Sequence, residues 1–547
     1  MVVGETELLS PKAPQCYTPA KMKLPARLLP LLLLPAILRA EQPPGTNEIA
    51  LGRAVAAILA DPEVARAHWG ISVVALDGQP IYTLNDGQSF EPASNAKLFT
   101  TAAAFAVFSP DAQFKTNVLA RGTLDPDGTL HGDIVIKGGG DPSVSGRAWP
   151  YAGKTERPNP PLQALDDLAA QIAKGGLVHK VTGRVVGDDT EFPFEPYGSG
   201  WAWDDLQWDY GAPVSALTIN DNVVYLDLMP GAKIGDPLAA AWNPAVPYYA
   251  LESTAVTGPP APKPRLGIDR QPGSKTVRLY GTLPASSKGV HLALAIEDPA
   301  EFAALAFRQM LVAHGVAVAG EAVALHTLSV STADFLDESF TPLPSPLPSA
   351  QALPAAISPT DKLLATHASP PLVQDLTVIN KVSQNLHAEL VLRELGKAVL
   401  PNDPDAGSIA AGARVVRQFL IQAGVDPKDF LFYDGSGLSP QDLITPRAAT
   451  TLLAYAARQP WGAAFRSTLP IAGVDGSLAG RYTQSPVKGK LAAKTGTLSE
   501  VNALSGYLTA RSGKTVVLSI LCNAHDPAGN ASHQAADRIV EAIYAAN

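Results

Sequence analysis

Apolar and polar positions follow helical and strand periods in turn at the beginning of this 547-residue chain. Residues 47–61 carry apolar side chains at helical spacing. Residues 71–84 then form two alternating segments on either side of Asp77-Gly78, a pair typical of a tight β-turn. An alanine-rich segment over residues 94–108 follows and predicts another helix. The N-terminal part is therefore expected to hold a helix, a β-hairpin and a second helix.

The C-terminal end of the chain shows a matching set of elements. Residues 490–498, 501–510 and 514–523 have the composition of three strands in a meander. Residues 531–547 have the amphipathic spacing of a closing helix. Strands at both ends of one chain suggest a single antiparallel sheet of five strands with helices packed on it. We therefore expect a mixed α/β fold of the α+β kind.

A different pattern separates these two ends. From about residue 113 to residue 351, short strands alternate with turns rich in glycine and aspartate. A proline-rich segment at 340–356 closes this part, after which residues 352–460 return to helical spacing. We therefore expect a β-rich insertion at 113–351 between two parts of one domain, 41–112 and 352–547.

The first forty residues predict an export signal. Basic residues precede a short apolar segment that ends at Ala40, which is the pattern of a cleaved secretory signal over 1–40. Met22 is an alternative start, because the residues before it do not fit that pattern. Cleavage would leave Cys522 as the one cysteine, in an apolar strand where a buried, inert thiol is expected. These features favour a periplasmic protein without disulfides.

Composition and charge exclude several classes of protein. Hydrophobic residues make up 46% and charged residues 17% of the chain, which excludes a disordered chain, and no apolar run fits a multi-span membrane protein. Acidic residues outnumber basic ones, 51 to 42, without a basic stripe, so no nucleic-acid partner is expected. The ten histidines are scattered, and His387-x-Glu389 lacks the spacing of a zinc-binding helix motif. We expect no metal and no cofactor.

The first candidate motif for catalysis is S-x-x-K. Ser94 and Lys97 lie three positions apart at the predicted start of a helix, so both side chains share one face. A serine hydroxyl needs an adjacent base to become a nucleophile, and a lysine with a lowered pKa can supply it. The string alone is weak, because Ser485 and Lys488 form a second copy just before a predicted strand.

Two further motifs complete the candidate site. Ser383-Gln384-Asn385 is an S-x-N in a helical region, where a turn with a capping serine is the simpler interpretation. Residues 494–497 read K-T-G-T on a predicted strand, where the lysine suits an anionic substrate end and the glycine suits close backbone approach. The order S-x-x-K, S-x-N, K-T-G, each in a fitting context, marks serine β-lactamases and penicillin-binding proteins.

The long separation of Lys97 from Ser383 narrows the choice within that superfamily. A compact β-lactamase has only a small helical domain there, whereas a large β-rich insertion resembles the class C low-molecular-mass penicillin-binding proteins, the D-alanyl-D-alanine carboxypeptidase/endopeptidase family. Five segments also resemble that family: 132–144, 183–192, 200–205, 210–217 and 433–439. The resemblance implies a transpeptidase-like domain that carries a two-subdomain insertion.

The resemblance also implies roles for the motif residues. Ser94 would be acylated by the penultimate D-Ala carbonyl or by a β-lactam, with Lys97 as its base. Ser383 would relay a proton to the leaving group, and Asn385 would bind the substrate amide. The K-T-G-T residues would bind the terminal carboxylate or help to form the oxyanion hole: Lys494, Thr495, Gly496 and Thr497.

One acidic residue of the insertion is a separate candidate. In the family, such a residue can meet the free amine of a diaminopimelate side chain, and Glu195 lies nearest to the corresponding segment. The spacing fits an exposed loop carboxylate equally well, so both interpretations remain open.

The function implied is that of a serine-type D-Ala-D-Ala carboxypeptidase, with D,D-endopeptidase activity, acting on peptidoglycan stem peptides and binding penicillin covalently. One alternative is a serine β-lactamase or esterase on the same scaffold, which would need a separate base for fast deacylation. Another is a non-catalytic peptidoglycan-binding protein, in which the motifs would be decayed. At most weak membrane association is expected.

Overall fold

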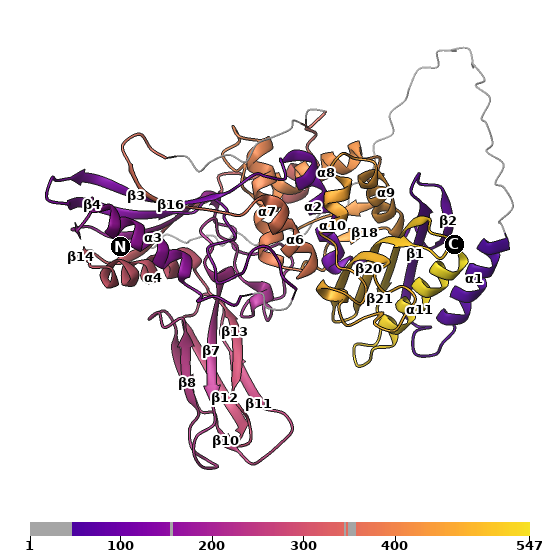
Figure 1. Cartoon of the computed structure of the whole chain (residues 1–547), viewed down its shortest axis with the longest axis horizontal. Helices are drawn as coiled ribbons and strands as arrows, with labels where there is room; N and C mark the ends of the chain where they lie inside the picture. The colour runs from indigo at the N-terminus through magenta and orange to yellow at the C-terminus, as the bar shows by residue number, and fades with distance from the viewer. Residues whose placement is uncertain (1–45, 154–156, 344–345, 348–356) are drawn as a thin grey trace, which may run out of the picture. The chain divides into compact units, whose positions relative to one another are not determined.

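A five-stranded antiparallel sheet joins the two ends of the chain in the computed structural model, which describes residues 46–153, 157–343, 346–347 and 357–547 (Figure 1). Its strand order is β19–β20–β21–β1–β2. The N-terminal strands are β1 (His68–Ala75) and β2 (Pro80–Leu84), and the C-terminal strands are β19 (Leu491–Leu498), β20 (Val501–Thr509) and β21 (Thr515–Asn523). This order confirms the sheet predicted from the hairpin and the meander.

Both faces of this sheet are covered by helices, which explains the nearly continuous apolar run of β21. Leu518 and Ile520 pack into the core beneath α1 (Thr46–Leu59) and α11 (Ala531–Ala546). Val517 and Leu521 face the other way, into the larger core of the remaining helices, because successive strand residues point to opposite faces. Those helices are α2 (Ala96–Val107), α6 (Leu372–Lys381), α7 (Asn385–Val399), α8 (Ile409–Gln422), α9 (Pro446–Ala457) and α10 (Gly462–Ser467).

The residues between these parts form three further sheets. The largest is a mixed seven-stranded sheet, with helices α3 (Gln163–Gly175) and α4 (Pro299–Ala313) packed on its core. Its strands are β3 (Lys115–Leu124), β4 (Thr129–Lys137), β5 (Lys180–Val181), β6 (Val185–Pro193), β14 (Ala317–Val318), β15 (Ala322–Thr327) and β16 (Lys362–Ala368).

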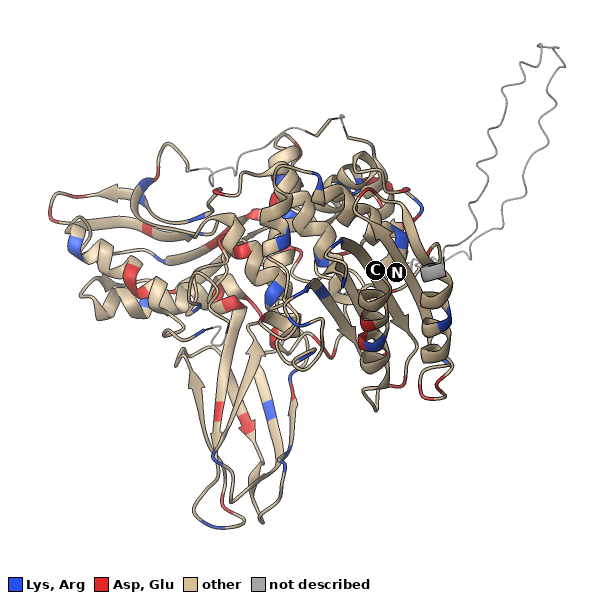
Figure 2. Cartoon of the chain, turned by 45° about the vertical axis from the view of Figure 1, so that its right-hand side comes forward, with Lys and Arg blue, Asp and Glu red and all other residues tan. Residues whose placement is uncertain are grey.

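Two smaller sheets lie next to each other in Figure 1. One has three strands, β7 (Val223–Met229), β8 (Ala239–Asn243) and β13 (Val290–Ala295). The other has four, β9 (Ala250–Ser253), β10 (Val256–Gly258), β11 (Arg265–Asp269) and β12 (Thr276–Pro284). Figure 2 shows basic and acidic positions mixed along the chain.

The predicted end of the insertion, residue 351, lies outside the described residues and stays a prediction, but the described residues on either side of it divide differently. The chain leaves these sheets earlier, because Asp405 accepts hydrogen bonds from the N–H groups of Val330 and Ser331 and α5 (Phe335–Phe340) then packs against α8. It returns later as β16, which pairs antiparallel with β3. Residues 362–368 alternate too weakly to be recognised as a strand without that partner. We call residues 113–329 with β16 the insertion, and the other described residues the catalytic region.

The predicted export signal, residues 1–40, lies outside the described residues. Within the described ranges, no helix is both long and apolar enough to cross a bilayer. The short hairpin β17 (Phe430–Leu431) and β18 (Leu443–Ile444) flanks residues 433–439, one of the segments that resembles the family, and places that segment beside the first motif.

Candidate active site

The first motif lies where a short 3₁₀ turn, Ala93–Asn95, runs into α2. Lys97 Nζ donates a hydrogen bond of 3.0 Å to Ser94 Oγ, as expected for positions three apart on a helix. Ser94 is half-buried, whereas the Lys97 side chain is fully buried. The structure therefore brings the predicted nucleophile and base into direct contact.

Lys97 has two further partners, which place the second motif in the same site. Its Nζ donates to Asn385 Oδ1 at 2.6 Å and to the backbone carbonyl of Ser436 at 2.6 Å. Asn385 comes from the S-x-N motif at the start of α7, and Ser436 from the 433–439 segment. The ammonium thus has three oxygen partners, which is the number of its donors.

The electrostatic surroundings suit Lys97 to act as a base. Burial lowers its pKa from the usual 10.5 to about 8, because desolvation disfavours the charged form. The nearby carboxylates Asp434, Glu389 and Asp442 act in the opposite direction and limit the fall. A substantial fraction of Lys97 is therefore neutral at slightly alkaline pH and able to accept the proton of Ser94.

Asp434 organises the loop that approaches Lys97, and sequence reasoning did not single it out. Its carboxylate accepts hydrogen bonds from the backbone N–H groups of Ser436, Gly437 and Ser439, at 3.0, 2.6 and 2.8 Å. Trp201 of the insertion adds an indole N–H bond of 2.8 Å. The Asp-Gly-Ser-Gly composition signals a turn, but the sequence does not show that the turn presents a carbonyl to the base.

The third motif lies on β19 and faces the second. Lys494 Nζ donates to Ser383 Oγ at 2.9 Å and to the carbonyl of Thr495 at 2.7 Å. Lys494 is fully buried, and burial together with the neighbouring Lys97 holds its pKa well below the usual range. Ser383 therefore lies in contact with one motif lysine and Asn385 with the other.

Gly496 is required where β19 passes the turn before α2. A Cβ at this position would lie 2.6 Å from the carbonyl oxygen of Pro92 and 3.1 Å from the backbone nitrogen of Asn95. Only glycine allows the strand to approach this closely. The approach places Thr497, which is exposed, on the strand next to the turn that carries Ser94.

Glu195 is not brought to these motifs in the same way. Its carboxylate accepts a hydrogen bond of 2.9 Å from the N–H of Ile409, the first residue of α8, and its carbonyl accepts one of 2.8 Å from Arg393. A carboxylate at a helix N-terminus is stabilising, so these contacts give Glu195 a structural role. The substrate-binding role predicted for it stays a prediction.

The second S-x-x-K copy and His387 also have clear positions. Ser485 lies in a turn before β19, where its carbonyl accepts from the N–H of Lys488 at 3.1 Å. His387 is fully buried, with Nδ1 at 2.6 Å from Asp375 Oδ1. In the described part of the chain, no group of three or more His, Cys, Asp or Glu side chains is placed to hold a metal ion.

Comparisons with known proteins find carboxypeptidases among the relatives of this chain. A D-alanyl-D-alanine carboxypeptidase of an Actinomadura species is 32% identical over 510 residues, which cover 91% of this chain and 85% of that protein. The carboxypeptidase DacB of Haemophilus influenzae is 26% identical over 79% of this chain and 80% of its own length.

A solved structure supports the same fold. The crystal structure of penicillin binding protein 4 from Haemophilus influenzae superposes with a TM-score of 0.72, at 23% identity, over 90% of this chain and 98% of that one. The family model for D-Ala-D-Ala carboxypeptidase 3 matches residues 51–347 and 350–543, which is most of the chain. This protein therefore belongs to the D-Ala-D-Ala carboxypeptidase 3 (S13) family.

Proposed function

We propose that this protein is a serine-type D-Ala-D-Ala carboxypeptidase that cleaves peptidoglycan stem peptides through an acyl-enzyme on Ser94. The observation that carries the proposal is the hydrogen bond of 3.0 Å from Lys97 Nζ to Ser94 Oγ. The same Nζ also donates a hydrogen bond to Asn385 Oδ1. A nucleophile, a base with a lowered pKa and a polar partner are thereby assembled at one point.

Acylation follows from this arrangement. Neutral Lys97 takes the proton of Ser94 while Oγ bonds to the penultimate D-Ala carbonyl carbon, and the carbonyl oxygen becomes an oxyanion. The backbone N–H groups of Ser94 and Thr497 lie on adjoining elements, and we assign them to that oxyanion. As the peptide bond breaks, Ser383 gives its proton to the nitrogen of the departing D-Ala and is reprotonated with the proton that Lys97 took from Ser94. Water then hydrolyses the ester and regenerates Ser94.

Lys494 and Thr495 are assigned to the terminal carboxylate of the substrate. Burial and Lys97 lower the pKa of Lys494, and an arriving carboxylate would restore its ammonium form. Thr495 Oγ1 lies 2.6 Å from Ser477 Oγ. This hydrogen bond orients the Thr495 hydroxyl, which follows Lys494 on the same strand. Asn385 is assigned to the substrate amide. Attack on a D-Ala-linked cross-bridge by the same residues would be endopeptidase activity, and the predicted signal would place it in the periplasm.

The test is intact-protein mass spectrometry after addition of benzylpenicillin, followed over time. We expect a lasting increase of one drug mass in the native protein, none in Ser94→Ala, and an unchanged adduct in Ser485→Ala, the matched control. Release of D-Ala from a pentapeptide should follow the same pattern. An adduct on Ser94→Ala would refute the assignment. A transient adduct with accumulating hydrolysed drug would instead support the β-lactamase alternative.

A further inference from the structure

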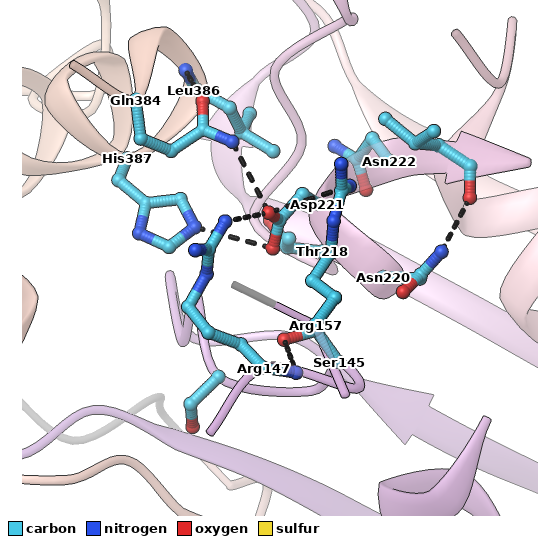
Figure 3. A network of polar contacts seen from close by, with 12 residues as sticks. Ser145, Arg147, Arg157, Thr218, Asn220, Asp221, Asn222, Gln384, Leu386 and His387 are labelled. Carbon is cyan, nitrogen blue, oxygen red and sulfur yellow. Dashed lines mark hydrogen bonds and ion pairs between the residues drawn. The ribbon is translucent and has the colours of Figure 1, made fainter. Parts of the chain in front are cut away.

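A buried polar network connects the insertion to the S-x-N motif (Figure 3). Asp221 of the insertion is fully buried. Its Oδ2 accepts a hydrogen bond of 3.2 Å from Gln384 Nε2, the middle residue of the motif. Its Oδ1 lies 3.4 Å from Nε2 of His387, in the first turn of α7. One carboxylate therefore faces two residues that flank Asn385.

The turn that carries Asp221 is held in an uncommon conformation. Asn220, Asp221 and Asn222 all have positive φ values, of 49°, 55° and 54°. The Asn222 side chain accepts from the N–H of Ile219 at 2.9 Å and donates to the carbonyl of Pro213 at 2.7 Å. Consecutive non-glycine residues in this region persist only when their surroundings hold them, and such strain gathers at functional sites.

The motif at the other end of the network is also a strained turn. Ser383 has a φ of 68°, and the Oε1 of Gln384 caps α7 by accepting from the N–H of Leu386 at 3.0 Å. The Gln384 amide thus lies between Asp221 and the first turn of the helix. Moving that amide would move both neighbouring residues. Ser383 accepts a hydrogen bond from Lys494, and Asn385 accepts one from Lys97.

A second insertion contact holds Asn385 itself. While Asn385 Oδ1 accepts from Lys97, its Nδ2 donates to the backbone carbonyl of Tyr210 at 2.8 Å. Tyr210 belongs to the short 3₁₀ turn Asp209–Gly211, which precedes the Asp221 turn. The insertion therefore contacts the motif on both sides of its helix start.

The negative charge of Asp221 faces two arginine side chains. Arg147 pairs with it directly, and Arg157 lies 3.6 Å away. Burial opposes ionisation, but Arg147, His387 and Arg157 outweigh it and hold the pKa of Asp221 well below its usual value. Asp209 is the other acidic group whose charge reaches Asp221.

His387 joins this carboxylate to the catalytic region. It lies between Asp221 and Asp375 of α6, both buried. Burial lowers the pKa of His387, but the two carboxylates outweigh it and raise the pKa above its usual value. The Asp221 carboxylate therefore has an attractive partner in His387 on α7.

We propose that Asp221 is a positioning residue through which the insertion sets the geometry of Ser383 and Asn385, acting on Gln384 and His387. The inference rests on the proposed function, because its readout is acylation of Ser94. The insertion in this view is part of the active site and not only an appended module. A displacement of about 1 Å at a catalytic group can cost on the order of a hundredfold in rate.

The first test compares Asp221→Asn with Asp189→Asn. Asp189 is a matched control, because it is also a buried insertion carboxylate that pairs with a histidine, His326 at 2.8 Å, within the insertion itself. We expect benzylpenicillin acylation to slow roughly 10- to 100-fold in Asp221→Asn, with Asp189→Asn close to native. For D-Ala release, kcat should fall by a larger factor than KM changes. Equal losses in both folded variants, or native rates in Asp221→Asn, would overturn the proposal.

The second test is a charge exchange that stays decisive if Asp221→Asn alone fails to fold. Gln384→Glu keeps the cap on Leu386 but faces Asp221 with a like charge, so acylation should slow. Adding Asp221→Asn places an amide donor opposite the new carboxylate at position 384 and restores the total charge of the native pair. The double variant should therefore regain much of the acylation rate. Absence of slowing in Gln384→Glu, or of rescue in the double variant, would refute the coupling. A native protein that forms no Ser94 adduct would instead refute the proposed function.

Discussion

The two sides of the active site are held by different parts of the molecule. Ser94, Lys97 and Lys494 lie on or beside α2 and β19, elements of the catalytic region whose two lysine side chains are fully buried. Ser383 lies in the turn between α6 and α7, Asn385 is the first residue of α7, and both are partly exposed. The motif donates two hydrogen bonds to the insertion, from Gln384 to the Asp221 carboxylate and from Asn385 to the Tyr210 carbonyl.

The difference follows from how each side obtains its geometry. A helix start and a strand fix side-chain directions through their own backbone hydrogen bonds. The turn with a positive φ at Ser383 has a local cap from Gln384 to Leu386 but also depends on distant partners in the insertion. Trp201 of the insertion also reaches the loop beside Lys97 through Asp434. Changes at the Asp221 and Tyr210 turns should nevertheless reach the second motif selectively, while changes at the start of α2 should disable the nucleophile itself.

The largest effect is expected from Gly437→Val, on the side of the nucleophile. A Cβ at Gly437 would lie 1.8 Å from the carbonyl oxygen of Ala93, and the φ of 76° favours glycine. The loop must then move away, and Lys97 loses the carbonyl of Ser436. We expect benzylpenicillin acylation to fall at least about 100-fold, measured by stopped-flow or mass spectrometry.

Gly424→Val is the matched control for this change. Gly424 also has a left-handed φ, of 87°, but no atom lies within 4 Å of its Cβ position. It ends α8, so the substitution should cost stability of roughly 1–2 kcal/mol from backbone strain alone and leave acylation unchanged. Equal loss of acylation in both variants would show that strain, and not the contact with Ala93, matters.

The next effect concerns the pH dependence of the base. The neutral form of Lys97 grows as pH rises through its pKa of about 8, so the acylation rate should rise through that range. Burial and the nearby Asp434 raise the pKa of Glu389 to about 7, so it is an anion where Lys97 titrates. Glu389→Gln removes that charge, lowers the pKa of Lys97 and moves the rise to lower pH. Each unit of movement gives up to about tenfold more rate at pH 7.

Glu394→Gln provides the comparison for Glu389. Glu394 lies on the same helix, is equally buried, and burial raises its pKa to about 7 as well. It lies instead near Lys397 and Glu191, away from the group of carboxylates that act on Lys97. The pH profile of acylation should be unchanged in this variant. A shift of equal size in both would contradict a local electrostatic effect.

The same contrast explains which parts of the molecule could be predicted from the sequence. The five-stranded sheet and the first and third motifs were predictable, because strand alternation and helical spacing are local signals. The turn conformation of Ser383 and the contact of Gln384 with Asp221 were not, because they depend on residues more than 160 positions apart. The strand β16 was missed for the same reason, since it is specified by pairing with β3.

The glutamate chosen on the insertion shows a second limit. A carboxylate in a loop carries no local signal that separates a substrate contact from a helix cap. Glu195 lies at the N-terminus of α8, whereas the carboxylate that reaches the S-x-N motif is Asp221, in an Ile-Asn-Asp-Asn turn. Such Asx-rich turns are usually interpreted as loop stabilisers, and only the folded structure reveals the contact with Gln384.

The smallest effect on catalysis is expected from His326→Gln, within the insertion but away from the second motif. Hydrogen bonds to Asp189 and Asp298 raise the pKa of His326 to about 10, above the unfolded value of 6.5. The stabilisation is therefore complete below pH 6.5 and is lost as pH rises through 10. We expect the variant to unfold more easily by about 2 kcal/mol at pH 6.

The expected difference in stability between native protein and His326→Gln should shrink steadily from pH 6.5 to pH 10, as measured by thermal or denaturant unfolding. Acylation by benzylpenicillin should remain within about twofold of native at every pH where the protein is folded, since neither Asp189 nor Asp298 contacts the S-x-N turn in the contacts described. Slowed acylation in this variant would mean that the whole insertion, and not the Asp221 turn, governs the second motif. A stability difference that grows with pH would contradict the charged state assigned to His326.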